Sequence, residues 1–152
     1  MIKRLFEFGV IAGALLWPAA AMAATITVTE PQVRAMPTGV PNTAGYLQLQ
    51  AQQEDDALLA ASCEGVQRTE LHTLLMEDGL MKMRPVEQIP LPQGQTVALE
   101  QGGYHLMMMG LQHGASVGQQ LQCQLSFAKA APQTVVFTVV RIDKPSGHHH
   151  HH

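Results

Sequence analysis

Methionine and histidine side chains gather in one short part of the sequence. After residue 23 the chain has seven methionines, and six of them lie between Met76 and Met109. His72 and His105, two of the three histidines outside the C-terminal tail, lie in or beside the same stretch. Thioether sulfur is a soft, neutral ligand that suits Cu(I), and by extension Ag(I), but discriminates against Zn, Mg and Ca. The clustering therefore indicates a site for Cu(I).

The spacing of these residues suits β-strands. Alternate residues of a strand project from the same face. His105 and Met107 would therefore point to one side, while Leu106 between them points to the other. Met81 and Met83 would likewise share a face. Each of the two segments can present a pair of soft or imidazole ligands to one point.

A tight hairpin can bring the two halves of the cluster together. Residues 78–79 are Asp-Gly, the strongest short signal for a two-residue hairpin turn. That turn would place Met83 on the same face as His72, as its diagonal neighbour within reach of a long side chain. A second strand carrying His105 and Met107 would complete a site of four ligands.

Each methionine also has a packing interpretation, because methionine fills irregular gaps in hydrophobic cores. Met108 alternates away from Met107 and is predicted to be a core residue. Met76, Met81 and Met109 are predicted either to support the ligands from a second layer or to pack in the core.

The chain has two cysteines, Cys63 and Cys123. An even number of cysteines in an exported protein favours a disulfide. Closing so long a loop would stabilise the fold by roughly 4 kcal/mol in the chain-entropy account. Two buried free thiols on neighbouring strands, or a redox or metal-binding thiol pair, are the alternatives, although the sequence has no CxxC spacing.

Short apolar and β-branched runs, separated by turn residues, extend along the chain. Turn-forming residues occur at 37–39, 77–79, 92–94 and 101–103. This pattern predicts one all-β domain, a sandwich or a Greek-key barrel. The predicted strands are 25–29, 45–49, 58–62, 67–76, 80–86, 96–99, 105–109, 119–127 and 134–141.

Residues 1–23 are typical of a secretory signal peptide. Lys3 and Arg4 precede an apolar run over 9–17, and Ala-Met-Ala at 21–23 fits signal peptidase. The run is short for a membrane anchor, which needs about 20 residues. No cysteine directly follows it, which argues against a lipid anchor. We expect an exported, periplasmic domain over 24–144 with no membrane span.

Net charge and the tail carry further information. Beyond residue 23 the chain has seven basic and eleven acidic residues, so its surface is unsuited to nucleic acid. Residues 145–152 form a separate tail that ends in five histidines at 148–152. The tail is either a purification tag or a natural His-rich extension.

The Met/His stretch resembles the PCuAC family of periplasmic copper chaperones, whose signature is H(M)-x10-M-x21-H-x-M. Ten residues separate His72 from Met83, twenty-one separate Met83 from His105, and Met107 follows in place. Thr73 stands where the optional Met would be. Segments 34–37 and 43–46 also resemble the family's N-terminal region, so the likeness covers nearly the whole domain.

The resemblance implies a cupredoxin-like Greek-key barrel with one exposed Cu(I) site formed by the four motif residues. It also implies delivery of copper to a copper-accepting oxidase subunit, particularly the Cu(A) centre, in some members beside a Sco-type thiol protein. In some members a Met/His-rich C-terminal extension binds Cu(II), and the five-histidine tail is compatible with such a role.

No nucleophile or positioned base accompanies the four ligands, so we expect a copper carrier and not an enzyme. Two alternatives stay open. Cys63 and Cys123 could serve a thiol–disulfide reductase, or the domain could be a binding module whose methionines are only core residues. Copper stoichiometry, thiol count and thiol-exchange activity separate the three.

Overall fold

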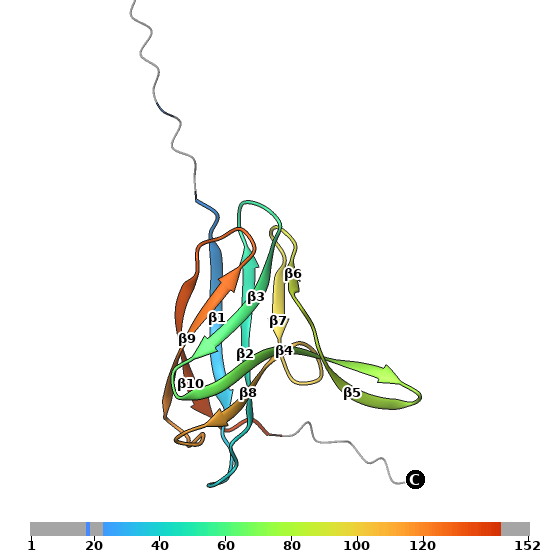
Figure 1. The fold of residues 1–152 in the computed structure, drawn as a ribbon. Helices are drawn as coiled ribbons and strands as arrows, with labels where there is room; N and C mark the ends of the chain where they lie inside the picture. The colour runs from blue at the N-terminus through green and yellow to red at the C-terminus, as the bar shows by residue number, and fades with distance from the viewer. Residues whose placement is uncertain (1–17, 19–22, 144–152) are drawn as a thin grey trace, which may run out of the picture.

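The computed structural model describes Pro18 and residues 23–143 of the chain. Ten β-strands form this described part (Figure 1). They are β1 (Ile26–Arg34), β2 (Thr43–Ala51), β3 (Asp56–Cys63), β4 (Val66–Glu77), β5 (Leu80–Pro85), β6 (Ile89–Leu91), β7 (Thr96–Leu99), β8 (His105–Leu111), β9 (Gln120–Phe127) and β10 (Gln133–Val140).

The strands form one sheet in the order β5-β4-β8-β2-β1-β10-β9-β3-β6, and β7 pairs with β2 beside that path. β1 and β10 pair in parallel, whereas the other recorded pairs are antiparallel. The sheet curls around on itself in Figure 1. The predicted all-β architecture is therefore confirmed.

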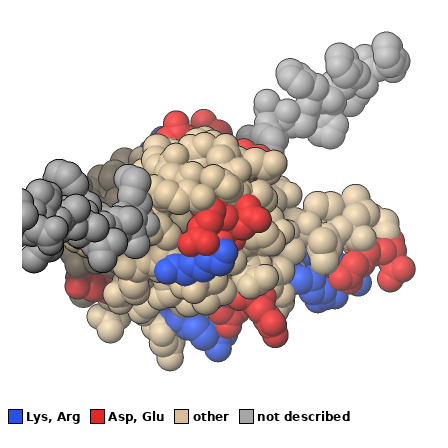
Figure 2. Space-filling view, turned by 90° about the horizontal axis from the view of Figure 1, so that it is seen from above, with Lys and Arg blue, Asp and Glu red and all other residues tan. Residues whose placement is uncertain are grey.

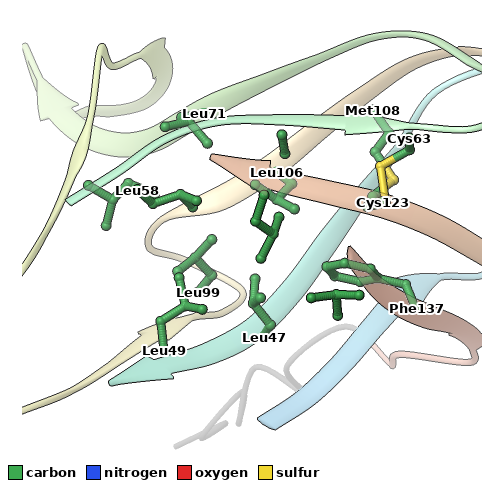
Figure 3. Close-up of a cluster of buried hydrophobic side chains, with 14 of the residues drawn as sticks. Leu47, Leu49, Leu58, Cys63, Leu71, Leu99, Leu106, Met108, Cys123 and Phe137 are labelled. Atoms are coloured by element: carbon green, nitrogen blue, oxygen red, sulfur yellow. A yellow bond between two sulfur atoms is a disulfide. The ribbon is translucent and has the colours of Figure 1, made fainter. Parts of the chain in front are cut away.

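The inner face of the curled sheet encloses a single hydrophobic core (Figure 3). β2 shows how the sequence produces this arrangement, because Leu47 and Leu49 are buried while Gln48 and Gln50 are more exposed. β8 alternates likewise, and Leu106 and Met108 are fully buried in the core. The opposite face of β8 is thereby left for other residues, including Met107.

Two strand predictions were incomplete. β1 continues to Arg34, five residues past the predicted end, because a register shift between Thr29 and Gln32 accommodates the Glu-Pro pair at 30–31. Glu30 there has a φ of 53°. The sequence analysis does not predict β6, because Ile89-Pro90-Leu91 is too short to show an alternating pattern. It also contains a proline, and within sheets proline is found mainly on edge strands. β6 does lie at an edge of the sheet.

The β4–β5 hairpin has the register that its turn predicts. Asp78 and Gly79 both have positive φ, 52° and 76°, as a type I′ turn requires. Leu71 of β4 is buried in the core, but the following residues of β4 and all of β5 are partly or fully exposed. The hairpin accordingly projects from the side of the domain in Figure 1.

Cys63 and Cys123 lie directly opposite each other on β3 and β9 and are joined by a disulfide. Both cysteines are buried, at 6% and 1% exposure. The bond links two cysteines that are 60 residues apart in sequence, within the core shown in Figure 3.

Candidate metal site

His72 and His105 lie side by side on one face of the sheet. They are directly opposed in the antiparallel β4–β8 pair. Their ring centroids are 5.7 Å apart, and the ring planes are tilted by 56°. The neighbouring pair, Leu71 and Leu106, points to the core and fixes which face the histidines occupy.

One nitrogen of each imidazole is held by an oxygen acceptor. Nε2 of His72 lies 2.8 Å from Oε2 of Glu70, and Nδ1 of His105 lies 3.1 Å from the carbonyl oxygen of Gly103. In a neutral imidazole these nitrogens carry the proton, so the other nitrogen of each ring keeps its lone pair. A metal-ligating histidine usually donates its remaining N–H in this way.

The lone-pair nitrogens, Nδ1 of His72 and Nε2 of His105, are buried. Neither has a hydrogen-bond partner among the residues that the structure describes. Buried polar atoms are normally paired, and an unpaired one points to a role such as binding an ion. Two such atoms on adjacent opposed residues therefore favour a cation between or beside the rings.

The surroundings of His105 favour its neutral form. Burial lowers the pKa of His105, and proximity to His72 lowers it further, against the opposing effect of the Gly103 carbonyl. The hydrogen bond from His72 lowers the pKa of Glu70. Partial desolvation raises this pKa, whereas the nearby charge of Arg68 lowers it further. Glu70 is therefore an anionic acceptor that orients the His72 ring.

The two thioethers flank the histidines on the same sheet face. Met83 of β5 pairs with Leu74, two residues after His72, and Met107 of β8 follows His105 by two residues. Met83, His105 and Met107 line one open pocket of about 310 Å³. Met83 is 51% exposed and His105 only 3%, so the lining of the pocket includes both a solvent-exposed thioether and a buried imidazole.

The other methionines of the Met/His stretch lie in different environments. Met108 is fully buried in the core, as its alternation predicts. Met109 lies at the far end of β8, where its sulfur is 3.5 Å from the Arg68 guanidinium. Met76 and Met81 pair across the hairpin tip and are both exposed, so the core interpretation is wrong for these two.

Several residues around the pocket were not predicted from the sequence. Glu70 could have been found, because it lies two positions before His72 and therefore on the same face of the strand. Gly103 contributes a backbone carbonyl, for which a side-chain pattern gives no signal. On the pocket wall, the Gln101 oxygen accepts from the Arg34 guanidinium at 3.0 and 3.1 Å, in the amide orientation that satisfies both groups.

The donor set fits a soft monovalent cation. It offers two imidazole nitrogens and two uncharged thioethers, which together favour Cu(I) over Cu(II), an ion that prefers tetragonal nitrogen and oxygen ligands.

The predicted signal peptide falls almost wholly on residues outside the described part, as does the five-histidine tail. Within the described residues, no helix is long and apolar enough to cross a membrane.

The all-β fold, together with the sheet face that carries the two histidines and the two thioethers, defines the class of protein: a domain of the PCuAC, cupredoxin-like kind. The family described as "Putative lipoprotein LpqE-like" matches residues 26–139. The chain belongs to this LpqE-like, PCuAC-type family. No curated protein matches the sequence.

Solved structures with a similar fold include PCuAC domains. The apo PCuAC domain from PmoF1 is 21% identical, with a TM-score of 0.66 over 79% of this chain and 97% of that one. Apo-DR1885 from Deinococcus radiodurans is 25% identical, with a TM-score of 0.60 over 93% of this chain and 97% of that one. The Cu(I) form of DR1885 is 26% identical, with a TM-score of 0.56 over 82% of each chain. The structural neighbours thus include copper-binding domains.

Proposed function

We propose that the protein is a periplasmic copper chaperone that carries one Cu(I) ion on His72, Met83, His105 and Met107. The observation that carries the proposal is a pair of buried ring nitrogens, on His72 and His105, that have no partner within the described part of the chain. Two thioethers lie on the same sheet face. The likeness to the Cu(I) form of DR1885 supports it.

The ligands differ in exposure, which suggests an order for release. Met83 is half exposed, whereas His105 is almost completely buried. A partner's ligand would therefore reach the ion from the Met83 side and replace that thioether first. The imidazole of His105 would be the last ligand to dissociate from the ion. Copper stays monovalent throughout, because each step exchanges one ligand for another.

Cu(I) titration in competition with a soluble chelator tests the assignment. The chain should bind one Cu(I) tightly, with both sulfur and nitrogen in its X-ray absorption spectrum. Replacing Met83 and Met107 by leucine keeps the apolar volume and removes both sulfurs, so the tight site should disappear.

Met109→Leu is the matched control, because Met109 lies on the same strand and face as Met107 but contacts Arg68. It should leave the Cu(I) affinity unchanged. A copper shell of nitrogen and oxygen alone would refute the roles of Met83 and Met107, and would direct attention to the tail at 148–152.

Delivery and location complete the proposal. From the family resemblance, we propose transfer to copper-enzyme assembly, specifically the Cu(A) site of a respiratory oxidase subunit, with or without a Sco-type thiol protein. The predicted signal peptide supports export. Cu(II) binding by the five-histidine tail stays a prediction, since the tail is outside the described residues.

The buried position of the Cys63–Cys123 disulfide gives no support to the thiol–disulfide reductase alternative, because such chemistry needs an accessible sulfur. A non-metal binding module would leave the two buried ring nitrogens without a role. The titration above distinguishes both alternatives from the chaperone.

A further inference from the structure

The tip of the β4–β5 hairpin exposes an unusual set of side chains. Eight large hydrophobic residues of the described part are exposed, and five of these lie on this hairpin. They are Leu75, Met76, Leu80, Met81 and Met83, at 48%, 66%, 63%, 53% and 51%. Apolar surface concentrated in one place usually marks a site of interaction.

The hairpin has two different faces. On one face, Glu77 receives hydrogen bonds from Arg84 at 3.0 and 2.7 Å and lies 3.5 Å from Lys82. Figure 2 shows charged residues along one side of the projecting part at the right, whereas its other side is uncharged. The second face carries the pairs Met76–Met81 and Leu74–Met83. This uncharged face continues along β4 to His72.

Met76 and Met81 are directly opposite each other, one on each strand beside the turn. Directly opposed residues have Cβ atoms about 4.5–5.5 Å apart, so two flexible thioethers can converge on one ion. Thioether pairs favour soft monovalent cations over harder divalent ones. We propose that Met76 and Met81 form a second, outer binding site for Cu(I) or Ag(I).

This outer site lies in line with the four-residue site. Met81 and Met83 are alternate residues of β5 on the same face, about 7 Å apart along the strand. An ion held by Met76 and Met81 can form a bond to the Met83 sulfur as it gives up the bond to Met81, with no change in oxidation state. The role of the outer pair as the first contact for incoming copper rests on the proposed function.

Ag(I) is a suitable probe because it is soft and does not change oxidation state under the conditions used. Protein labelled with ¹³C at the methionine methyl groups reports each thioether separately, so Ag(I) taken up by the histidine tail does not obscure the result. The first equivalent should shift the Met83 and Met107 methyls, and further Ag(I) should shift those of Met76 and Met81.

Met76→Leu tests whether the two outer thioethers act together. It preserves apolar surface but removes one sulfur, so the Met81 methyl should no longer shift at the same Ag(I) concentration. Met81→Leu should act reciprocally on Met76. In the Met76→Leu/Met81→Leu variant, Cu(I) transfer from a soluble donor to the inner site should slow several-fold while its affinity is unchanged.

Leu80→Ala is the matched control, because Leu80 is equally exposed at the same tip but lies on the charged face opposite Glu77. The Met81 shift should persist in this variant. The outer site is refuted if the Met76 and Met81 methyls never respond, or if Met81 responds equally after Met76→Leu. A response at the outer pair without any response at Met83 and Met107 would support the outer site and refute the chaperone site instead.

Discussion

Nε2 of His72 bonds to the carboxylate of Glu70, a residue two positions earlier on the same face of β4. When Nε2 donates to Glu70 in this contact, the lone pair of the neutral ring is on Nδ1, which is buried. The contact connects two partly buried side chains, Glu70 at 34% and His72 at 13% side-chain exposure.

Glu70→Ala should therefore weaken Cu(I) binding. Removing a residue that orients a ligating histidine typically lowers metal affinity about 10–100-fold. Chelator competition measures the change. Glu77→Ala, a carboxylate on the opposite face of the same strand, is the control and should bind as the wild type does. Equal affinities for the two variants would show that Glu70 does not position His72.

Replacing both Met83 and Met107 by histidine should change the preference for oxidation state. Imidazole accommodates Cu(II) and Zn as well as Cu(I), whereas thioether is biased towards soft ions. The double variant should hold Cu(II) more tightly and lose its preference for Ag(I), as competition titrations would show. The metal-free fold should survive because Met83 is half exposed. A large loss of thermal stability would instead show that these methionines act as core residues.

The Asp56 carboxylate should make stability depend on acid pH. It accepts backbone N–H bonds from Ala57, Lys129 and Ala130 at 2.8, 2.9 and 2.8 Å. Burial raises the pKa of Asp56, but these bonds outweigh that effect and lower it overall. Because the folded-state pKa is depressed, the stabilisation is present above the unfolded value of about 3.9 and is lost as pH falls through the folded value.

Asp56→Asn should lower the free energy of unfolding at pH 7 by about 2 kcal/mol and flatten the acid dependence, measured by urea denaturation at a series of pH values. Asp55→Asn is the control, because Asp55 caps a single exposed backbone N–H, that of Gln93. Equal losses for both variants would argue against the buried Asp56 contacts as the cause.

Reducing the Cys63–Cys123 disulfide should destabilise the fold without removing the copper site. The loop that it closes predicts a loss of roughly 4 kcal/mol in the free energy of unfolding. Denaturation with and without reductant measures this loss. Cu(I) binding by the folded fraction should persist, since both cysteines lie outside the pocket. Free thiols in the unreduced, denatured protein would contradict the bond.

The sequence was most informative where local chemistry decides the structure. The Asp-Gly turn alone determines the β4–β5 register, and that register determines which face Met83 occupies. Features that depend on the pairing of strands distant in sequence could not be predicted in this way. No local pattern could show that β8 would pair with β4 so that His105 lies opposite His72, or that the Gly103 carbonyl would contact the His105 ring. β6 was missed because three residues cannot show a period.

The parallel pair of β1 and β10 has a consequence for how the sheet assembles. Among the described strands, β10 is the last in sequence, and it lies between β1 and β9, where it joins the two halves of the sheet. Without residues 133–140 the chain could form only two partial sheets with unpaired edges and an uncovered core. The two partial sheets therefore stay separate until residues 133–140 are available to pair with both β1 and β9.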